Sequence, residues 1–289
     1  MRYTVFEIMV LFLGLVVLSS CTQKATSEIE WASSLEEAFQ LASENDQPII
    51  AEFWSERCSW CERLEDSTFT HKSVIDLSKG MVFVKAEAKL DTLCRERYEI
   101  AGFPTVILMN SSGEEIDRIF GFLPPKEFVS TIQDYLQEKN TLEDLKRRFE
   151  ADPKDALLAF QLADKYEGRR MYEEASSYYT KVVDLDPNDE KGNSDDALFN
   201  LAWLKVREKE YLKAVDAFNH FLHKFPKSEM VTIAERYIPY CYSRTGDTTR
   251  ALKLFEEFLV LYPDSPDTGW VGDQIRALKG LSMSTDKAD

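Results

Sequence analysis

The pattern of apolar and polar positions changes near residue 153, and this change divides the chain into two parts. In the first part, apolar runs of strand length alternate with amphipathic stretches, and Gly, Pro and Ser separate them. The apolar runs predict strands at 49–54, 81–86, 102–109 and 115–120. The amphipathic stretches predict helices at 36–43, 91–98 and 124–139, and one more that begins near residue 58. Strands that alternate with helices indicate an α/β domain.

The second part carries only helix-period patterns, and one motif recurs in it three times. An alanine marks the same place in each copy, and Ala175, Ala214 and Ala251 lie 39 and 37 residues apart. The extra length between the first two copies falls in the polar segment 189–195, and the segment 273–281 predicts a capping helix. Three stacked copies are about the minimum that buries a shared core.

Composition excludes one class of function. The chain has 35 Lys and Arg residues against 51 Asp and Glu residues, which gives a formal net charge of −16 at pH 7. A nucleic-acid-binding protein needs a basic surface, so we exclude nucleic acid as a partner. The acidity otherwise indicates a soluble surface and says little about a specific partner.

The first twenty residues have the character of a leader. Arg2 supplies positive charge, and the apolar run 8–18 is too short to cross a bilayer as a permanent helix. The run ends in Leu-Ser-Ser-Cys at 18–21, which resembles the lipobox of bacterial lipoproteins. The resemblance implies cleavage before Cys21 and lipid attachment to Cys21, and Thr22 favours the outer membrane. An ordinary cleaved signal or an uncleaved anchor is the alternative.

The five cysteines fall into three groups. Cys21 ends the leader, Cys58 and Cys61 form a Cys-x-x-Cys pair, and Cys94 and Cys241 stand alone. No second pair completes a four-thiolate site, so we expect neither a structural metal nor a cofactor. An exported chain meets conditions in which disulfides form, so the pair can cycle if a partner supplies reducing equivalents.

The cysteine pair follows directly on an apolar strand and opens a helix, which suits thiol–disulfide exchange. Cys58 lies where the free N–H groups of the first turn and the helix dipole favour a thiolate, so we assign it as the nucleophile. Cys61 follows one turn later on the same face, and we assign it as the resolving thiol. Arg57 adds positive potential that lowers the pKa of the nucleophile. A purely structural disulfide is the alternative.

The order of these elements resembles thioredoxin. A Cys-x-x-Cys pair follows an inner strand, and Gly-Phe-Pro-Thr at 102–105 precedes a later one. The resemblance covers 31–139 and implies the α/β thioredoxin fold, in which helices flank a central mixed sheet. Cys-Ser-Trp-Cys at 58–61, followed by Leu-Glu-Asp-Ser-Thr-Phe at 64–69, is most similar to the thioredoxin-like domains of exported bacterial proteins.

The resemblance implies roles for Glu52, Pro104 and Phe103, and the aromatic side chain of Trp60, where thioredoxin has a proline, predicts a further one. Glu52 stands in an apolar strand where thioredoxin has a buried aspartate that exchanges a proton with the resolving thiol, and a solvated glutamate is the alternative. Pro104 matches the cis-proline that faces the cysteines and leaves the backbone of Phe103 to pair with an extended substrate. An ordinary trans proline is the alternative. Trp60 presents an apolar face to protein substrates.

The repeated motif is similar to the tetratricopeptide repeat, and its last two copies resemble repeats of outer-membrane lipoproteins that scaffold envelope machinery. The resemblance implies an all-α solenoid that recruits a protein partner. We divide the chain into a signal peptide at 1–20, a tether at 21–30, a thioredoxin-like domain at 31–139, a helical linker at 140–152, a tetratricopeptide-repeat domain at 153–281 and a tail at 282–289.

Two functions fit these features. The first is a lipid-anchored, extracytoplasmic thiol–disulfide oxidoreductase that works in the reducing or isomerising direction on exported proteins. A redox protein would supply its electrons, and the repeats would recruit a protein partner. The second is an envelope scaffold lipoprotein in which the repeats act, while the first domain binds partners or senses redox state. Both functions place the protein on the periplasmic face of the bacterial cell envelope.

Overall fold

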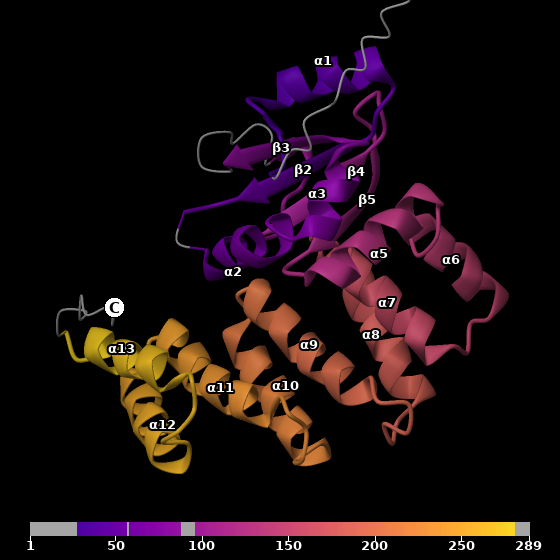
Figure 1. Ribbon diagram of the computed structural model, residues 1–289. Helices are drawn as coiled ribbons and strands as arrows, with labels where there is room; N and C mark the ends of the chain where they lie inside the picture. The colour runs from indigo at the N-terminus through magenta and orange to yellow at the C-terminus, as the bar shows by residue number, and fades with distance from the viewer. Residues whose placement is uncertain (1–27, 57, 88–95, 281–289) are drawn as a thin grey trace, which may run out of the picture.

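The computed structural model describes residues 28–56, 58–87 and 96–280. They form an N-terminal α/β region of residues 28–136 and a helical region of residues 142–280 (Figure 1). Within these residues, no helix has both the length and the apolar character that a membrane crossing requires.

The N-terminal region contains the predicted strands and helices. The strands predicted at 49–54 and 115–120 have those bounds in the structure. The strand predicted at 102–109 starts only at Thr105, because the proline before it has no N–H for a strand ladder. Residues 91–95 of the helix predicted at 91–98 lie outside the described residues. The elements are β1 Trp31–Ala32, α1 Leu35–Asn45, β2 Ile49–Trp54, α2 Ser59–Arg63, the π-helix η1 Leu64–Phe69, α3 Lys72–Ser78, β3 Val82–Glu87, β4 Thr105–Met109, β5 Glu115–Phe120 and α5 Pro125–Leu136.

The five strands form one mixed sheet in the order β1-β3-β2-β4-β5. The central strand β2 runs parallel to β3 and antiparallel to β4, and β5 closes the far edge as the second strand of a hairpin. The edge strand β1 was not predicted, since two residues are too few for an alternating pattern.

Helices cover both faces of the sheet (Figure 1). Successive residues of a strand point to opposite faces, so β2 contributes to two apolar cores. Ala51 and Phe53 pack in the core on the side of α1. Ile50 packs in the other core, with Leu64 of η1 and Phe128 of α5. A side chain at position 52 therefore points to the face that η1 and α5 cover.

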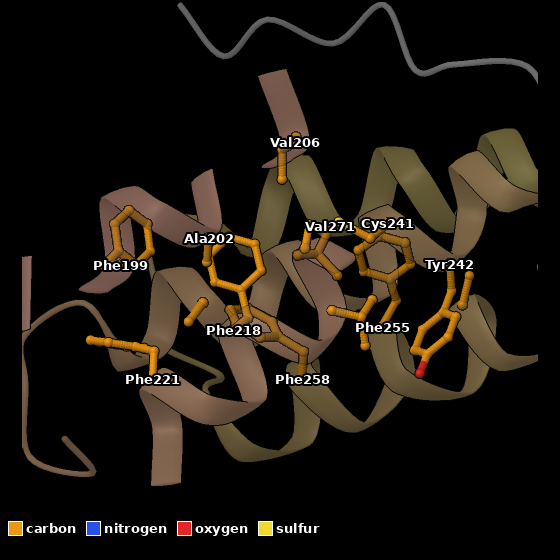
Figure 2. Packing of buried hydrophobic residues seen from close by; sticks show 14 of the residues in the cluster. Phe199, Ala202, Val206, Phe218, Phe221, Cys241, Tyr242, Phe255, Phe258 and Val271 are labelled. Carbon is orange, nitrogen blue, oxygen red and sulfur yellow. The ribbon is translucent and has the colours of Figure 1, made fainter. Parts of the chain in front are cut away.

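In the helical region each helix packs on the next one in the chain. Large aromatic side chains of α9, α10 and α12 point toward one another and fill the core between the helices (Figure 2). The three predicted copies are the pairs α7–α8, α9–α10 and α11–α12. The elements are α6 Leu142–Ala151, α7 Ala156–Glu167, α8 Tyr172–Leu185, α9 Ser194–Arg207, α10 Tyr211–Lys224, α11 Val231–Thr245, α12 Thr248–Leu261 and α13 Thr268–Leu278.

Two segments differ from the prediction. The predicted linker at 140–152 contains α6, whose Leu145 and Phe149 are buried in the same core as α7 and α8. The capping helix starts at Thr268 rather than at 273, because Val271 packs into the core and this burial outweighs the weak helix preference of the neighbouring glycines.

A buried ionic network joins the two regions. Asp117 of β5 is fully buried and lies 2.7 Å from the Nζ of Lys165, in the last turn of α7, and 2.6 Å from a guanidinium nitrogen of Arg169, just after that helix. The backbone N–H of Leu142 also donates to Asp117, at 2.7 Å. Burial raises the pKa of Asp117, but the two cations more than offset this effect, so its pKa lies below the ordinary value. Its stabilising contribution is therefore present at neutral pH and lost in acid.

We expect Asp117→Asn to lower the free energy of unfolding by about 3 kcal/mol at pH 7, because Lys165 and Arg169 lose their buried counter-ion. Urea titration measures the change. Asp76→Asn is the matched control, since Asp76 also pairs with two cations, Lys72 and Lys79, but is exposed on α3. Equal effects of the two substitutions would contradict the prediction.

Candidate redox site

The two cysteines of the pair differ in exposure. β2 ends at Trp54, and after a short turn Cys58 caps the first turn of α2. The sulfurs of Cys58 and Cys61 are bonded, and their Cα atoms lie 5.2 Å apart, within the range of natural disulfides. Cys61 is only 2% exposed, whereas Cys58 is partly exposed. An incoming sulfur can therefore reach Cys58 and not Cys61.

The backbone of α2 is arranged to stabilise negative charge on Cys58. The N–H of Cys61 points at the sulfur of Cys58, with 3.2 Å between nitrogen and sulfur. A thiolate at this position would accept the same hydrogen bond more strongly, because a charged acceptor strengthens it. The local geometry therefore favours Cys58 as the thiolate.

Glu52 is buried in β2 without a hydrogen-bond partner. Its side chain is fully buried, and among the described residues neither carboxylate oxygen has a hydrogen-bond partner. Burial raises its pKa to about 8, although the charge of Lys85 works against this rise and that of Glu65 adds to it. A carboxyl group in this state holds its proton near neutral pH and can exchange it.

Lys85 and Glu65 form an ion pair on the same face of the sheet as Glu52. Lys85 of β3 stands opposite Glu52 in the strand register, and its Nζ lies 2.9 Å from Glu65 of η1. Neither Lys85 nor Glu65 is among the site residues that the sequence predicts. The available signal was that Lys85 interrupts an apolar strand as Glu52 does, but only the register of β2 and β3 brings the two charges together.

The loop before β4 lies beside the end of β2. The peptide bond between Phe103 and Pro104 is cis, and the hydroxyl of Thr105 donates to the carbonyl of Gly102 at 2.8 Å. Thr105 pairs with Phe53, the residue before the last one in β2. The sheet register thus brings the Pro104 loop to the edge from which the chain leaves for the cysteine pair.

These features occur together in one known family. A family model of thioredoxin-like domains matches residues 35–136, which include Glu52, both cysteines and Pro104. Residues 35–136 form a thioredoxin-like domain. In the helical region, a tetratricopeptide-repeat model matches residues 158–189, and a model of outer membrane lipoproteins matches residues 191–287. The predicted fold class, a thioredoxin-like domain followed by helical repeats, is confirmed.

Several curated proteins and solved structures resemble the chain. It is 24% identical over 117 residues to the thiol:disulfide interchange protein DsbD of Klebsiella pneumoniae, a match that covers 38% of this chain and 19% of DsbD. It is 25% identical over 103 residues to a thioredoxin of Alicyclobacillus acidocaldarius, which covers 34% of this chain and 91% of that protein. The solved structure of a DsbH oxidoreductase matches 42% of this chain and 92% of its own, at 18% identity and a TM-score of 0.35. The chain thus spans about a fifth of the length of DsbD.

The thioredoxin-like domain carries an aromatic surface next to its cysteine pair. Trp60 is 53% exposed and stacks on Phe122, with ring centroids 5.9 Å apart. The guanidinium carbon of Arg63 lies 5.4 Å from the centroid of Trp60 and 4.9 Å from that of Phe122. Stacking and cation–π contacts hold Trp60 in place although it is exposed, so it offers an apolar surface beside Cys58.

Some predicted residues lie elsewhere. Cys21 and Arg57 lie outside the described residues, as does Cys94. Cys241 is buried in the core of the helical region, and this burial raises the pKa of its thiol to about 12. In the part of the chain that the structure describes, no three His, Cys, Asp or Glu side chains come together in a way that could hold a metal ion.

Proposed function

We propose that the protein is a thiol–disulfide oxidoreductase that acts on exported proteins through Cys58 and Cys61. The observation that carries this proposal is the pair itself: a partly exposed Cys58 bonded to a buried Cys61, in a domain whose sheet also holds the buried, unpaired Glu52. The similarity to DsbD and to thioredoxin supports the same reaction.

Reduction of a substrate would proceed in two exchanges. The thiolate of Cys58 attacks one sulfur of the substrate disulfide, that S–S bond breaks, and the other substrate sulfur leaves as a thiolate that takes a proton from water. Cys61 then gives its proton to Glu52 and attacks the sulfur of Cys58, which breaks the mixed disulfide and releases the second substrate sulfur as a thiolate that also takes a proton from water. The substrate gains two electrons and two protons, and the pair becomes the disulfide that the structure holds.

The oxidised pair must then be reset by an external dithiol, which supplies two electrons through the same exchange. In that direction Glu52 returns a proton to the sulfur of Cys61. A pKa of about 8 suits both directions, because the carboxyl group is mostly protonated but partly ionised at neutral pH.

The other parts of the chain support a place in the cell envelope. The similarity of residues 191–287 to outer membrane lipoproteins agrees with a lipid anchor at Cys21 and an envelope location. We propose that the anchor holds the redox site on the periplasmic face and that the helical region recruits a protein partner. We further propose that the pair works in the reducing or isomerising direction.

Cys61→Ser tests the proposed reaction. Without the resolving thiol, the mixed disulfide between Cys58 and the substrate cannot be resolved from within the pair, so it should accumulate. Non-reducing gels of the variant, incubated with an oxidised exported protein, should show an adduct that dithiothreitol removes. Cys58→Ser with Cys61→Ser is the control and should show no adduct. Absence of the adduct together with no reduction of insulin by the wild type would end the oxidoreductase proposal.

An envelope scaffold is the second candidate function. The match of residues 191–287 to outer membrane lipoproteins favours it, because this match lies outside the thioredoxin-like domain. If cells with Cys58→Ser and Cys61→Ser grow normally while deletion of residues 153–281 impairs them, the scaffold function is supported over the redox function.

A further inference from the structure

A side chain of the helical region contacts the loop that leads to Pro104. Arg207, the last residue of α9, donates from a terminal guanidinium nitrogen to the backbone carbonyl of Ala101, at 3.3 Å. A Cβ built on Gly102 would lie 3.8 Å from the same nitrogen. A guanidinium from the second region therefore touches the loop that carries Phe103 and Pro104.

Close contacts also join the helical region to the sheet next to the loop that Arg207 contacts. The ring of Phe120 packs between two glycines, since a Cβ on Gly102 would lie 3.1 Å from the ring and one on Gly168 would lie 3.0 Å from the Cβ of Phe120. Gly168 directly follows α7, the helix that Asp117 holds through its ionic network. Phe120 at the end of β5 thus lies between the Gly102 loop and the end of α7.

The guanidinium of Arg207 is only partly paired with acceptor groups of the protein. Within the described residues it forms no ion pair within 4.0 Å, and its Nε has no hydrogen-bond partner. Its guanidinium carbon lies 5.9 Å from the ring of Trp203. Glu167 is the acidic group whose charge it influences, but Glu167 accepts a hydrogen bond from Tyr179 at 2.9 Å, and burial raises its pKa. A guanidinium has five N–H donors, and because the Nε of Arg207 is buried, its two terminal nitrogens are the donors that another acceptor would meet.

A second guanidinium borders the site. Arg63 packs against Trp60 and Phe122 beside the cysteine pair. Arg63 and Arg207 place positive charge beside the cysteine pair and at the loop before Pro104, while Glu62 of α2 carries the opposite charge. A guanidinium at this loop favours a negatively charged group on a molecule that lies along the loop.

We propose that Arg207 is a substrate-recognition residue of the redox site, and that it binds a carboxylate of a protein substrate lying along the Pro104 loop. This inference rests on the proposed oxidoreductase function. The substrates that it selects are polypeptides with Asp or Glu near the reactive cysteine. Arg207 takes part in binding and orientation, and the sulfur chemistry stays with the cysteine pair. The repeats therefore contribute to the redox site itself in addition to any partner that they recruit.

Three disulfide-bonded peptides test the proposal on the full chain. They are identical except that the residue next to the cysteine is Glu, Gln or Lys, and kcat/KM for their reduction is measured with dithiothreitol as the electron source. The wild type should prefer the order Glu, Gln, Lys. Arg207→Gln should lower kcat/KM for the Glu peptide about tenfold, because a charge-assisted hydrogen bond is lost. The same variant should leave the Gln peptide within about twofold of the wild type.

Arg207→Glu distinguishes a role in substrate recognition from a purely structural effect of the substitution. A carboxylate at this place should reverse the preference, so that the Lys peptide becomes the best of the three. A loosened fold would slow all peptides alike and would not reverse their order. Arg244→Gln on α11 is the matched control, since Arg244 is exposed and its guanidinium lies over Tyr211. It should leave the wild-type order unchanged.

The outcomes separate this proposal from the function on which it rests. If Arg207→Glu keeps the wild-type order of peptides, Arg207 does not recognise the substrate and the inference is wrong. If the wild type reduces none of the three peptides, the oxidoreductase function itself fails. A reversed preference in Arg207→Glu supports both.

Discussion

Cys58→Ser should lower the rate of disulfide reduction by about 10³-fold or more, to the level of the uncatalysed reaction. A serine hydroxyl has a far higher pKa than a thiol and forms no disulfide, so the first exchange cannot occur. The loss follows from the structure because Cys61 cannot replace Cys58: it is only 2% exposed, and a substrate sulfur cannot reach it. Insulin reduction, followed by turbidity with dithiothreitol as the electron source, measures the loss.

Cys241→Ala serves as the control for this substitution. Cys241 is buried in the helical region with a pKa of about 12, so it is not a thiolate near neutral pH and takes no part in exchange. The variant should reduce insulin at the wild-type rate. A Cys58→Ser protein that still reduces insulin would show that another thiol acts as the nucleophile.

Glu52→Gln should have two measurable effects, one on the rate and one on stability. Glutamine has the same shape as a protonated glutamate but cannot accept the proton of Cys61. The second exchange should therefore slow by about 100-fold near pH 7, as expected for the loss of a general base. Rapid-mixing experiments that follow the decay of the mixed disulfide measure this step. The first exchange should keep its rate, because Cys58 does not depend on Glu52.

The stability effect depends on pH, and its sign follows from the raised pKa. Below pH 4.5 both the folded and the unfolded chain hold the proton, so the ionisation of Glu52 does not lower the free energy of unfolding. Between pH 4.5 and about 8 the unfolded chain ionises while the folded one stays protonated, so the stability of the wild type falls as pH rises. We expect oxidised Glu52→Gln to exceed the wild type in free energy of unfolding by about 3 to 5 kcal/mol at pH 9.

Urea unfolding of the oxidised proteins at pH 5 and pH 9 checks this prediction. Glu127→Gln is the matched control, because Glu127 is exposed on α5 and should show no pH-dependent difference from the wild type. A Glu52→Gln protein whose stability stays parallel to that of the wild type from pH 5 to pH 9 would show that Glu52 is not held protonated.

The sequence predicted those parts of the fold whose signals are local. β2 and β5 have the predicted bounds, since apolar runs of strand length and flanking turn residues mark both strands. The helices α8, α10 and α12 lie where the repeated motif puts them. The sequence predicts a helix within the linker at 140–152, and α6 lies there, but only the packing shows that it buries Leu145 and Phe149 in the repeat core.

The residues of the candidate site also fall into two groups, those that the sequence predicts and those that only the packing brings to the site. The identity and spacing of Cys58 and Cys61 are features of four consecutive residues after a strand, so the sequence alone predicts them as a redox pair. Only the tertiary structure decided the surroundings of that pair. The sheet register puts Lys85 opposite Glu52, and the packing of α9 brings Arg207 to Ala101. Such contacts join residues far apart in the chain, and they depend on how elements pack rather than on any periodic pattern within one element.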